Sequence, residues 1–100
     1  MPSLNQIMSA TLKALNISRQ RYNAIQHTMQ SKAIDVRRLY SSVAKSFGYS
    51  TAVIAHSLGK DKSTVTYYLR QHRSFLSVYK EERELFAQIK DSLEKYKDVL

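Results

Sequence analysis

Short charged and hydroxyl side chains follow one another in the middle of the chain, where residues 60–64 read Lys-Asp-Lys-Ser-Thr. Ammonium and hydroxyl groups form hydrogen bonds with phosphates and with the edges of bases. Asp61 is a good N-cap, and a helix that begins after it carries Lys62, Ser63 and Thr64 in its first turn, pointing outward. The run therefore predicts a helix start that can contact nucleic acid.

Two helices joined by a tight turn are expected to position this run. Ala55 is small enough to let a second helix approach closely, Gly59 breaks the first helix, and Val65 is a β-branched anchor in the second. In a helix-turn-helix the first helix and the turn set the angle at which the second helix enters the major groove. Segment 51–70 therefore predicts such a motif; two packed helices with no DNA role are the alternative.

Apolar residues recur at helical spacing along the rest of the chain, which predicts an all-α fold with a central helix-turn-helix. Two Gly and one Pro are too few turn signals for an all-β chain of 100 residues. We expect one small domain over residues 1–100, made of a helical extension (1–30), a DNA-binding core (32–75) and a C-terminal packing helix (78–100). The apolar spacing also predicts two helices whose inner faces carry Tyr22, Ile25 and Met29 in one and Phe86, Ile89, Leu93, Tyr96 and Leu100 in the other. Ser50 or Thr51 is expected to cap the first helix of the helix-turn-helix, and the recognition helix is expected to end near Ser74.

Positive charge is concentrated in the first four fifths of the chain. Residues 1–80 hold 12 Lys or Arg and 2 acidic residues, a net charge of +10, whereas residues 81–100 hold 4 and 6, a net charge of −2. Such a field attracts polyanions, and double-stranded DNA is the partner we expect. A membrane surface is disfavoured, because the basic residues are scattered over several elements and no apolar run approaches the length of a bilayer span.

Catalytic and metal sites are not expected. The chain has no cysteine, and His27, His56 and His72 lack a metal-binding spacing. Ser57, Ser63 and Asp61 near His56 are accompanied by no strained glycine elbow. We therefore expect no enzyme activity and no cofactor, and we interpret the acidic run at 81–84 as a solvated first turn of a helix.

Two blocks of sequence resemble the C-terminal DNA-binding domain of the bacterial replication initiator DnaA. Residues 58–65, Leu-Gly-Lys-Asp-Lys-Ser-Thr-Val, are similar to that family's signature Gly-Gly-Arg-Asp-His-Thr-Thr-Val. Residues 37–45 are similar to its Arg-Gln followed by an apolar run that ends in Leu-Ala-Lys or Leu-Ala-Arg. The likeness spans roughly residues 32–90 and implies a cytoplasmic, nucleoid-associated protein of a bacterium or phage.

The resemblance implies roles for individual residues. Residues 61–64 would contact bases or nearby phosphates, Arg37 (or Arg38, if the alignment slips by one) would enter the minor groove, and Lys45 and Lys60 would flank the backbone. Lys62 stands where the family has His, and the turn is one residue shorter, which predicts a different target sequence. The predicted DNA-binding residues are Arg37, Arg38, Lys45, Thr51, Lys60, Asp61, Lys62, Ser63, Thr64, Tyr67 and Arg70.

The chain contains no phosphate-binding loop of the Gly-x-x-x-x-Gly-Lys-Ser/Thr type, so it is not expected to melt DNA with ATP. We expect a freestanding replication-accessory or transcription-regulatory module. RNA binding and a helical protein-interaction module are the alternatives. A homodimer or a protein partner could use the N-terminal or the C-terminal helix.

Overall fold

The computed structural model describes residues 1–96, and these residues form helices without any strand, as predicted. Four helices begin at a side chain that accepts a hydrogen bond from a backbone N–H of their first turn, a role played by Ser3, Ser18, Ser50 and Asp61. The elements are α1 (Leu4–Ala14), α2 (Arg19–Ile25), α3 (Ser31–Ser46), α4 (Thr51–Leu58), α5 (Lys62–Val78), α6 (Lys80–Leu93) and the short 3₁₀ helix η1 (Glu94–Tyr96).

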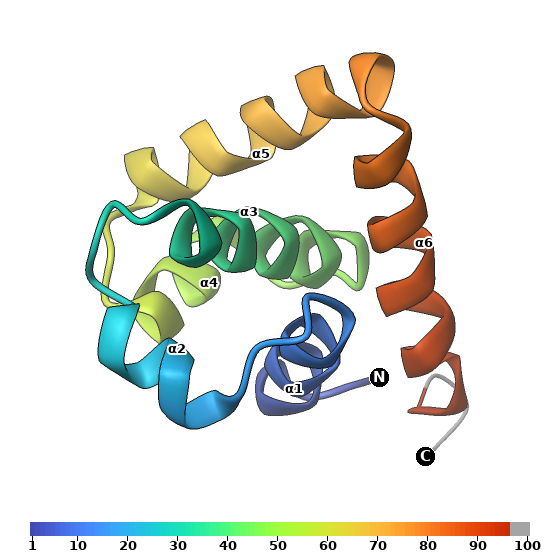
Figure 1. Cartoon of the computed structure of the whole chain (residues 1–100), viewed down its shortest axis with the longest axis horizontal. Coiled ribbons are helices and arrows are strands. Elements are labelled where there is room, and N and C mark those ends of the chain that lie inside the picture. Colours follow the sequence, from blue (N-terminus) through green and yellow to red (C-terminus); the bar gives the residue numbers. More distant parts are fainter. Residues whose placement is uncertain (97–100) are drawn as a thin grey trace.

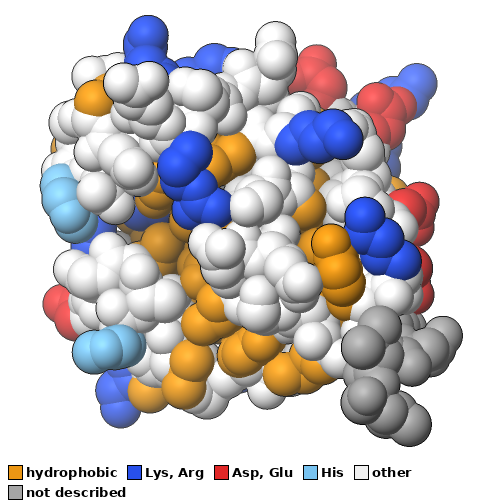
Figure 2. Space-filling view, turned by 90° about the horizontal axis from the view of Figure 1, so that it is seen from below, with side chains coloured by type: hydrophobic (Ala, Val, Ile, Leu, Met, Phe, Trp, Pro, Cys, Tyr) orange, Lys and Arg blue, Asp and Glu red, His pale blue; other side chains and the backbone are white. Residues whose placement is uncertain are grey.

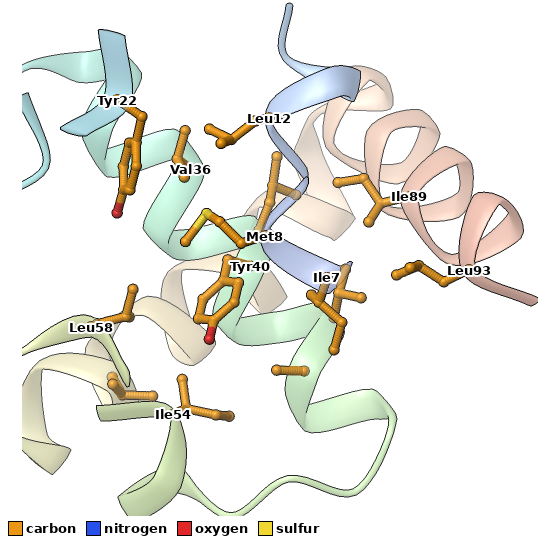
Figure 3. Close-up of a cluster of buried hydrophobic side chains, with 14 of the residues drawn as sticks. Ile7, Met8, Leu12, Tyr22, Val36, Tyr40, Ile54, Leu58, Ile89 and Leu93 are labelled. Atoms are coloured by element: carbon orange, nitrogen blue, oxygen red, sulfur yellow. The ribbon is translucent and has the colours of Figure 1, made fainter. Parts of the chain in front are cut away.

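Helix α3 is the central element, and the other helices are arranged around it (Figure 1). Helix α5 crosses one side of α3, while α1 lies on the other side and packs against α6. Side chains from α1, α2, α3, α4, α5 and α6 meet in one buried cluster (Figure 3). The three segments distinguished in the sequence, 1–30, 32–75 and the described part of 78–100, therefore contribute to a single core.

Helix α5 is longer than the sequence predicts. It continues past Ser74 to Val78, and a single extended residue, Tyr79 (φ −110°, ψ 117°), separates it from α6. No glycine or proline marks this bend, so the sequence carries no turn signal there. Of the predicted inner face of the last helix, Ile89 and Leu93 are buried, and Leu100 lies outside the described residues.

The prediction that Met29 faces inward is wrong. Helix α2 ends at Ile25, and Met29 lies in the connection to α3 with 83% of its surface exposed. Tyr22 and Ile25 are buried as predicted. The helix ends about one turn before Met29, so the helical spacing of the three residues does not bring Met29 into the core.

None of the helices formed by residues 1–96 is long and apolar enough to cross a bilayer.

Candidate nucleic-acid interface

Helices α4 and α5 are joined by the three-residue turn 59–61. Gly59 has φ +66°, a left-handed conformation that favours glycine, and its N–H donates to the His56 carbonyl. The N–H of Lys60 donates to the Ala55 carbonyl, which closes the end of α4. Ala55 is buried and α4 packs against α5, so the turn holds the start of α5 in a defined place.

The first turn of α5 is organised by one carboxylate. Asp61 Oδ1 accepts hydrogen bonds from the Thr64 hydroxyl (2.7 Å), the Thr64 N–H (2.9 Å) and the Ser63 hydroxyl (2.9 Å). The bonds from Thr64, followed by that from Ser63, hold the pKa of Asp61 below its ordinary value. Because both hydroxyl protons point to Asp61, the outward lone pairs of Ser63 and Thr64 are acceptors, suited to amino groups on base edges.

The outer face of α5 is basic along its length. Lys62, Tyr67, Arg70 and Arg73 are exposed, and no residue of α5 is acidic. Arg73, which is not among the predicted DNA-binding residues, extends this face by one turn. The face therefore combines three cations with an aromatic side chain, a composition suited to a polyanionic partner.

Two of the predicted residues lie at the corner between α3 and α4. Lys45 is exposed, and its ammonium lies 3.5 Å from the hydroxyl of Thr51, which is partly exposed. Lys45 and Arg73 border one groove of about 300 Å³ between the C-terminal half of α3 and α5. The structure thus brings Lys45 to the same side of the molecule as the C-terminal half of α5.

Arg37 does not reach this surface, contrary to the role that the resemblance implies. The side chain is 1% exposed, and its guanidinium donates to Tyr68 Oη (2.7 Å), to the Thr28 carbonyl (2.9 Å) and to the Gln26 carbonyl. Insertion into a minor groove would break all three hydrogen bonds and leave buried acceptors without donors. Arg37 instead caps the C-terminal end of α2 and connects it to α5.

Arg38 is not available to DNA either, because it is 5% exposed and bound by carboxylates. Its Nε and Nη2 lie 2.9 and 2.8 Å from the two oxygens of Glu82, and its Nη1 lies 2.9 Å from Asp35. His72 Nδ1 lies 2.7 Å from Glu82 Oε2. Arg38 therefore connects α3 to α6, and through His72 to α5.

The protonation state of this network follows from its hydrogen bonds. Burial favours the neutral form of Glu82, but the hydrogen bonds from His72 and Arg38 outweigh it and hold the Glu82 pKa below its ordinary value. For Arg38, burial acts in the opposite direction to the bonds with Glu82 and Asp35, and the net effect raises the pKa. Glu82 and Arg38 therefore form an ion pair at neutral pH.

The sequence interpretation missed both Glu82 and His72. Glu82 is 3% exposed rather than solvated, and His72 is 6% exposed. Glu82 stands among other acidic residues, and its partner Arg38 is 44 positions away, so no local pattern distinguishes it. Tyr68 on α5 is also buried, at 5% exposed, and its hydroxyl accepts the hydrogen bond from Arg37.

No family model, curated protein or solved structure matches this chain. Among residues 1–96, no group of three or more His, Asp or Glu side chains is placed to hold a metal ion.

Proposed function

We propose that the protein binds double-stranded DNA by placing α5 in the major groove, with a preference for certain sequences, in the service of replication or transcription. The observation that carries the proposal is the outer face of α5, which exposes Lys62, Arg70 and Arg73 and contains no acidic residue. The turn at Gly59 presents the N-terminal end of this helix first, as base-reading helices do.

The burial of Arg37 and Arg38 limits the number of cations that can meet phosphates. The exposed or partly exposed cations on and beside α5 are Lys45, Lys60, Lys62, Arg70 and Arg73. Each phosphate contact lowers the slope of log affinity against log salt by roughly 0.9. We expect a slope between about −3 and −5 on duplex DNA; a flat plot would contradict the proposal.

The opposite side of the molecule supplies a matched control. Helix α3 separates α5 from α1, and the view from below shows Lys and Arg scattered among hydrophobic side chains, with acidic side chains toward the right-hand edge and also at the left-hand edge (Figures 1 and 2). Lys13 on α1 and Arg21 on α2 are exposed and can be removed with the same change in net charge as Arg70 and Arg73.

The decisive experiment compares two double variants in fluorescence anisotropy with duplex DNA over a range of salt. Arg70→Ala/Arg73→Ala should weaken binding and reduce the magnitude of the salt slope by about 2, since two phosphate contacts are lost. Lys13→Ala/Arg21→Ala should change neither quantity appreciably. Equal losses in the two double variants would show that net charge alone, rather than α5, attracts DNA.

Base reading is tested separately from phosphate binding. Lys62→Ala or Ser63→Ala should weaken a duplex obtained by selection from random sequences by about 1–3 kcal/mol more than it weakens a random duplex. Equal losses on both duplexes would assign the two side chains to phosphates. A two-fold symmetric selected site would also indicate a dimer on DNA.

The alternatives differ in what they require of the surface. Single-stranded RNA recognition commonly uses aromatic side chains on a sheet, and residues 1–96 form no strand. A protein partner on the apolar side of the C-terminal helix is disfavoured because Ile89 and Leu93 are buried where α6 packs against α1. Comparing the affinities for duplex DNA and for single-stranded RNA at one salt concentration distinguishes DNA binding from RNA binding.

A further inference from the structure

A second groove borders the N-terminal half of α5. Contacts between cations and phosphates give no role to its apolar side chains. It has a volume of about 490 Å³ and lies between the first turns of α5 and the connection from α2 to α3. Its apolar walls come from Met29, Ile34, Tyr67 and Tyr68. Lys60, Ser63 and Thr64, which we place at the DNA, border the same groove.

The two walls of this groove expose large hydrophobic side chains. Met29 is 83% exposed and Tyr67 is 58% exposed, which places both among the few large hydrophobic residues exposed in the described part of the chain. They belong to separate elements, so their meeting at one groove is a product of the fold. Exposed apolar surface beside a polar binding site commonly marks a contact with a ligand.

Arg37 holds both walls in place. Its guanidinium donates to the carbonyl of Thr28, the residue before Met29, and to the phenol of Tyr68, the residue after Tyr67. Thr28 is further held by a bond from its hydroxyl to the Ile25 carbonyl (2.7 Å). The position of Met29 relative to α5 is therefore set by the hydrogen bonds of a buried arginine and of Thr28.

The charge around the groove favours an anionic partner. Within residues 1–96 no acidic side chain borders it, Lys60 stands at its edge, and the hydrogen bonds of Arg37 go to neutral oxygens. A duplex is an anion whose major groove presents one apolar group, the 5-methyl of thymine. An apolar groove beside a helix in the major groove therefore fits the methyl-bearing edge of thymine, and its volume leaves room for an adjacent base edge.

We propose that the groove bordered by Met29 and Tyr67 contacts thymine methyl groups in the target duplex, so that these two side chains determine specificity and Arg37 acts as the positioning residue for both. This inference rests on the proposed DNA binding. It assigns a reading role to the α2–α3 connection, outside the helix-turn-helix segment.

The test uses a duplex obtained by selection, in which each thymine is replaced in turn by deoxyuridine, so that only the methyl group is removed. The parent protein should bind at least one of these duplexes about fourfold more weakly, the value of one buried methyl group. In Met29→Ala the same replacement should have little effect, because the contact is already lost. Val53→Ala, which removes an exposed apolar side chain (46%) on α4 away from the groove, should retain the full fourfold penalty.

The outcomes separate this inference from the proposed function. Binding without any deoxyuridine effect, or with the same effect in Met29→Ala as in the parent, overturns the thymine contact and leaves DNA binding intact. Absence of duplex binding by the parent at all salt concentrations overturns both. Because Met29 is exposed, its variant should melt at the parent's temperature, which thermal unfolding checks directly.

Discussion

Arg37 and Arg38 are neighbours in α3, and both are buried, yet they hold the two halves of α5 by different chemistry. Arg37 donates to neutral oxygens and reaches the N-terminal half of α5 at Tyr68. Arg38 is bound by the carboxylates of Asp35 and Glu82 and reaches the C-terminal half through His72, with its guanidinium carbon 4.7 Å from the centre of the Phe75 ring.

The two arginines show that a basic protein can use some of its cationic side chains to stabilise its own fold. Both guanidinium groups are buried, so neither adds a free charge to the exposed surface. The Arg37 cluster lies beside the proposed reading end, and the acceptors of the Arg37 hydrogen bonds are a phenol and two backbone carbonyls, which carry no negative charge. The Arg38 cluster carries the acidic groups and lies where α5 meets α6. The following predictions test whether the two clusters differ as their chemistry implies.

The largest effect is expected from Glu82→Ala. The substitution leaves Arg38 buried without its bidentate partner and His72 without an acceptor, which should lower the free energy of unfolding by about 3–5 kcal/mol. Urea denaturation at pH 7 measures the loss. The control is Glu84→Ala on the same helix, whose carboxylate is 62% exposed and 3.6 Å from Lys80; it should change stability by less than about 0.5 kcal/mol. A similar loss of stability in both variants would mean that α6 is destabilised by alanine at any position, whether or not the side chain is buried.

A smaller but clear loss is expected from Arg37→Met, which keeps much of the apolar stem and removes the three donated hydrogen bonds. The carbonyls of Gln26 and Thr28 and the Tyr68 phenol lose their donor, at a cost of about 2–3 kcal/mol. Arg70→Met, on the exposed face, should cost less than about 0.5 kcal/mol in the same denaturation experiment. A stable Arg37→Met protein with weakened DNA binding would restore the minor-groove role.

The two clusters should also differ in their response to pH. The folded-state pKa of Glu82 lies below the ordinary value of 4.5, so the folded protein binds fewer protons than the unfolded chain. The contribution of ionised Glu82 to the free energy of unfolding is therefore fully present above about pH 4.5 and is lost as the pH falls through the folded-state pKa. Stability measured from pH 7 to pH 3 should fall less steeply in Glu82→Gln than in the parent, while Arg37→Met should keep the parent's slope. Asp61 contributes a change in the same direction to all of these proteins.

The smallest effect is expected at the cap of α5. Asp61→Ala removes the acceptor for the Thr64 N–H and frees the hydroxyls of Ser63 and Thr64, which should lower the melting temperature by a few degrees. Asp61→Asn retains an acceptor oxygen and should melt close to the parent. If the two variants melt alike, the carboxylate charge rather than the cap holds the first turn.

Most of the helix boundaries could be predicted because capping and amphipathic spacing are local. Ser50 and Asp61 each accept a hydrogen bond from the backbone N–H three residues further on, and Gly59 needs only its own conformational freedom to end α4. Of the candidate site, the first turn of α5 with Lys62 exposed follows from the same local rules. The bend at Tyr79 could not be predicted, because it carries no residue that breaks a helix.

The placement of the two arginines required the tertiary structure. Arg37 and Tyr68 are 31 positions apart, and Arg38 and Glu82 are 44 apart, so no periodicity within a helix relates them. The same limit applies to Met29 and Tyr67, which border one groove only because α2, α3 and α5 pack as they do.

By itself the sequence determined an all-α chain, the start of α5 at Asp61 and the basic composition of the outer face of that helix, because these depend on interactions within about one helical turn. Only the tertiary structure decided which positive charges remain outside. A buried guanidinium is tolerated where distant helices supply enough oxygen acceptors, and that supply is set by how α2, α5 and α6 pack around α3.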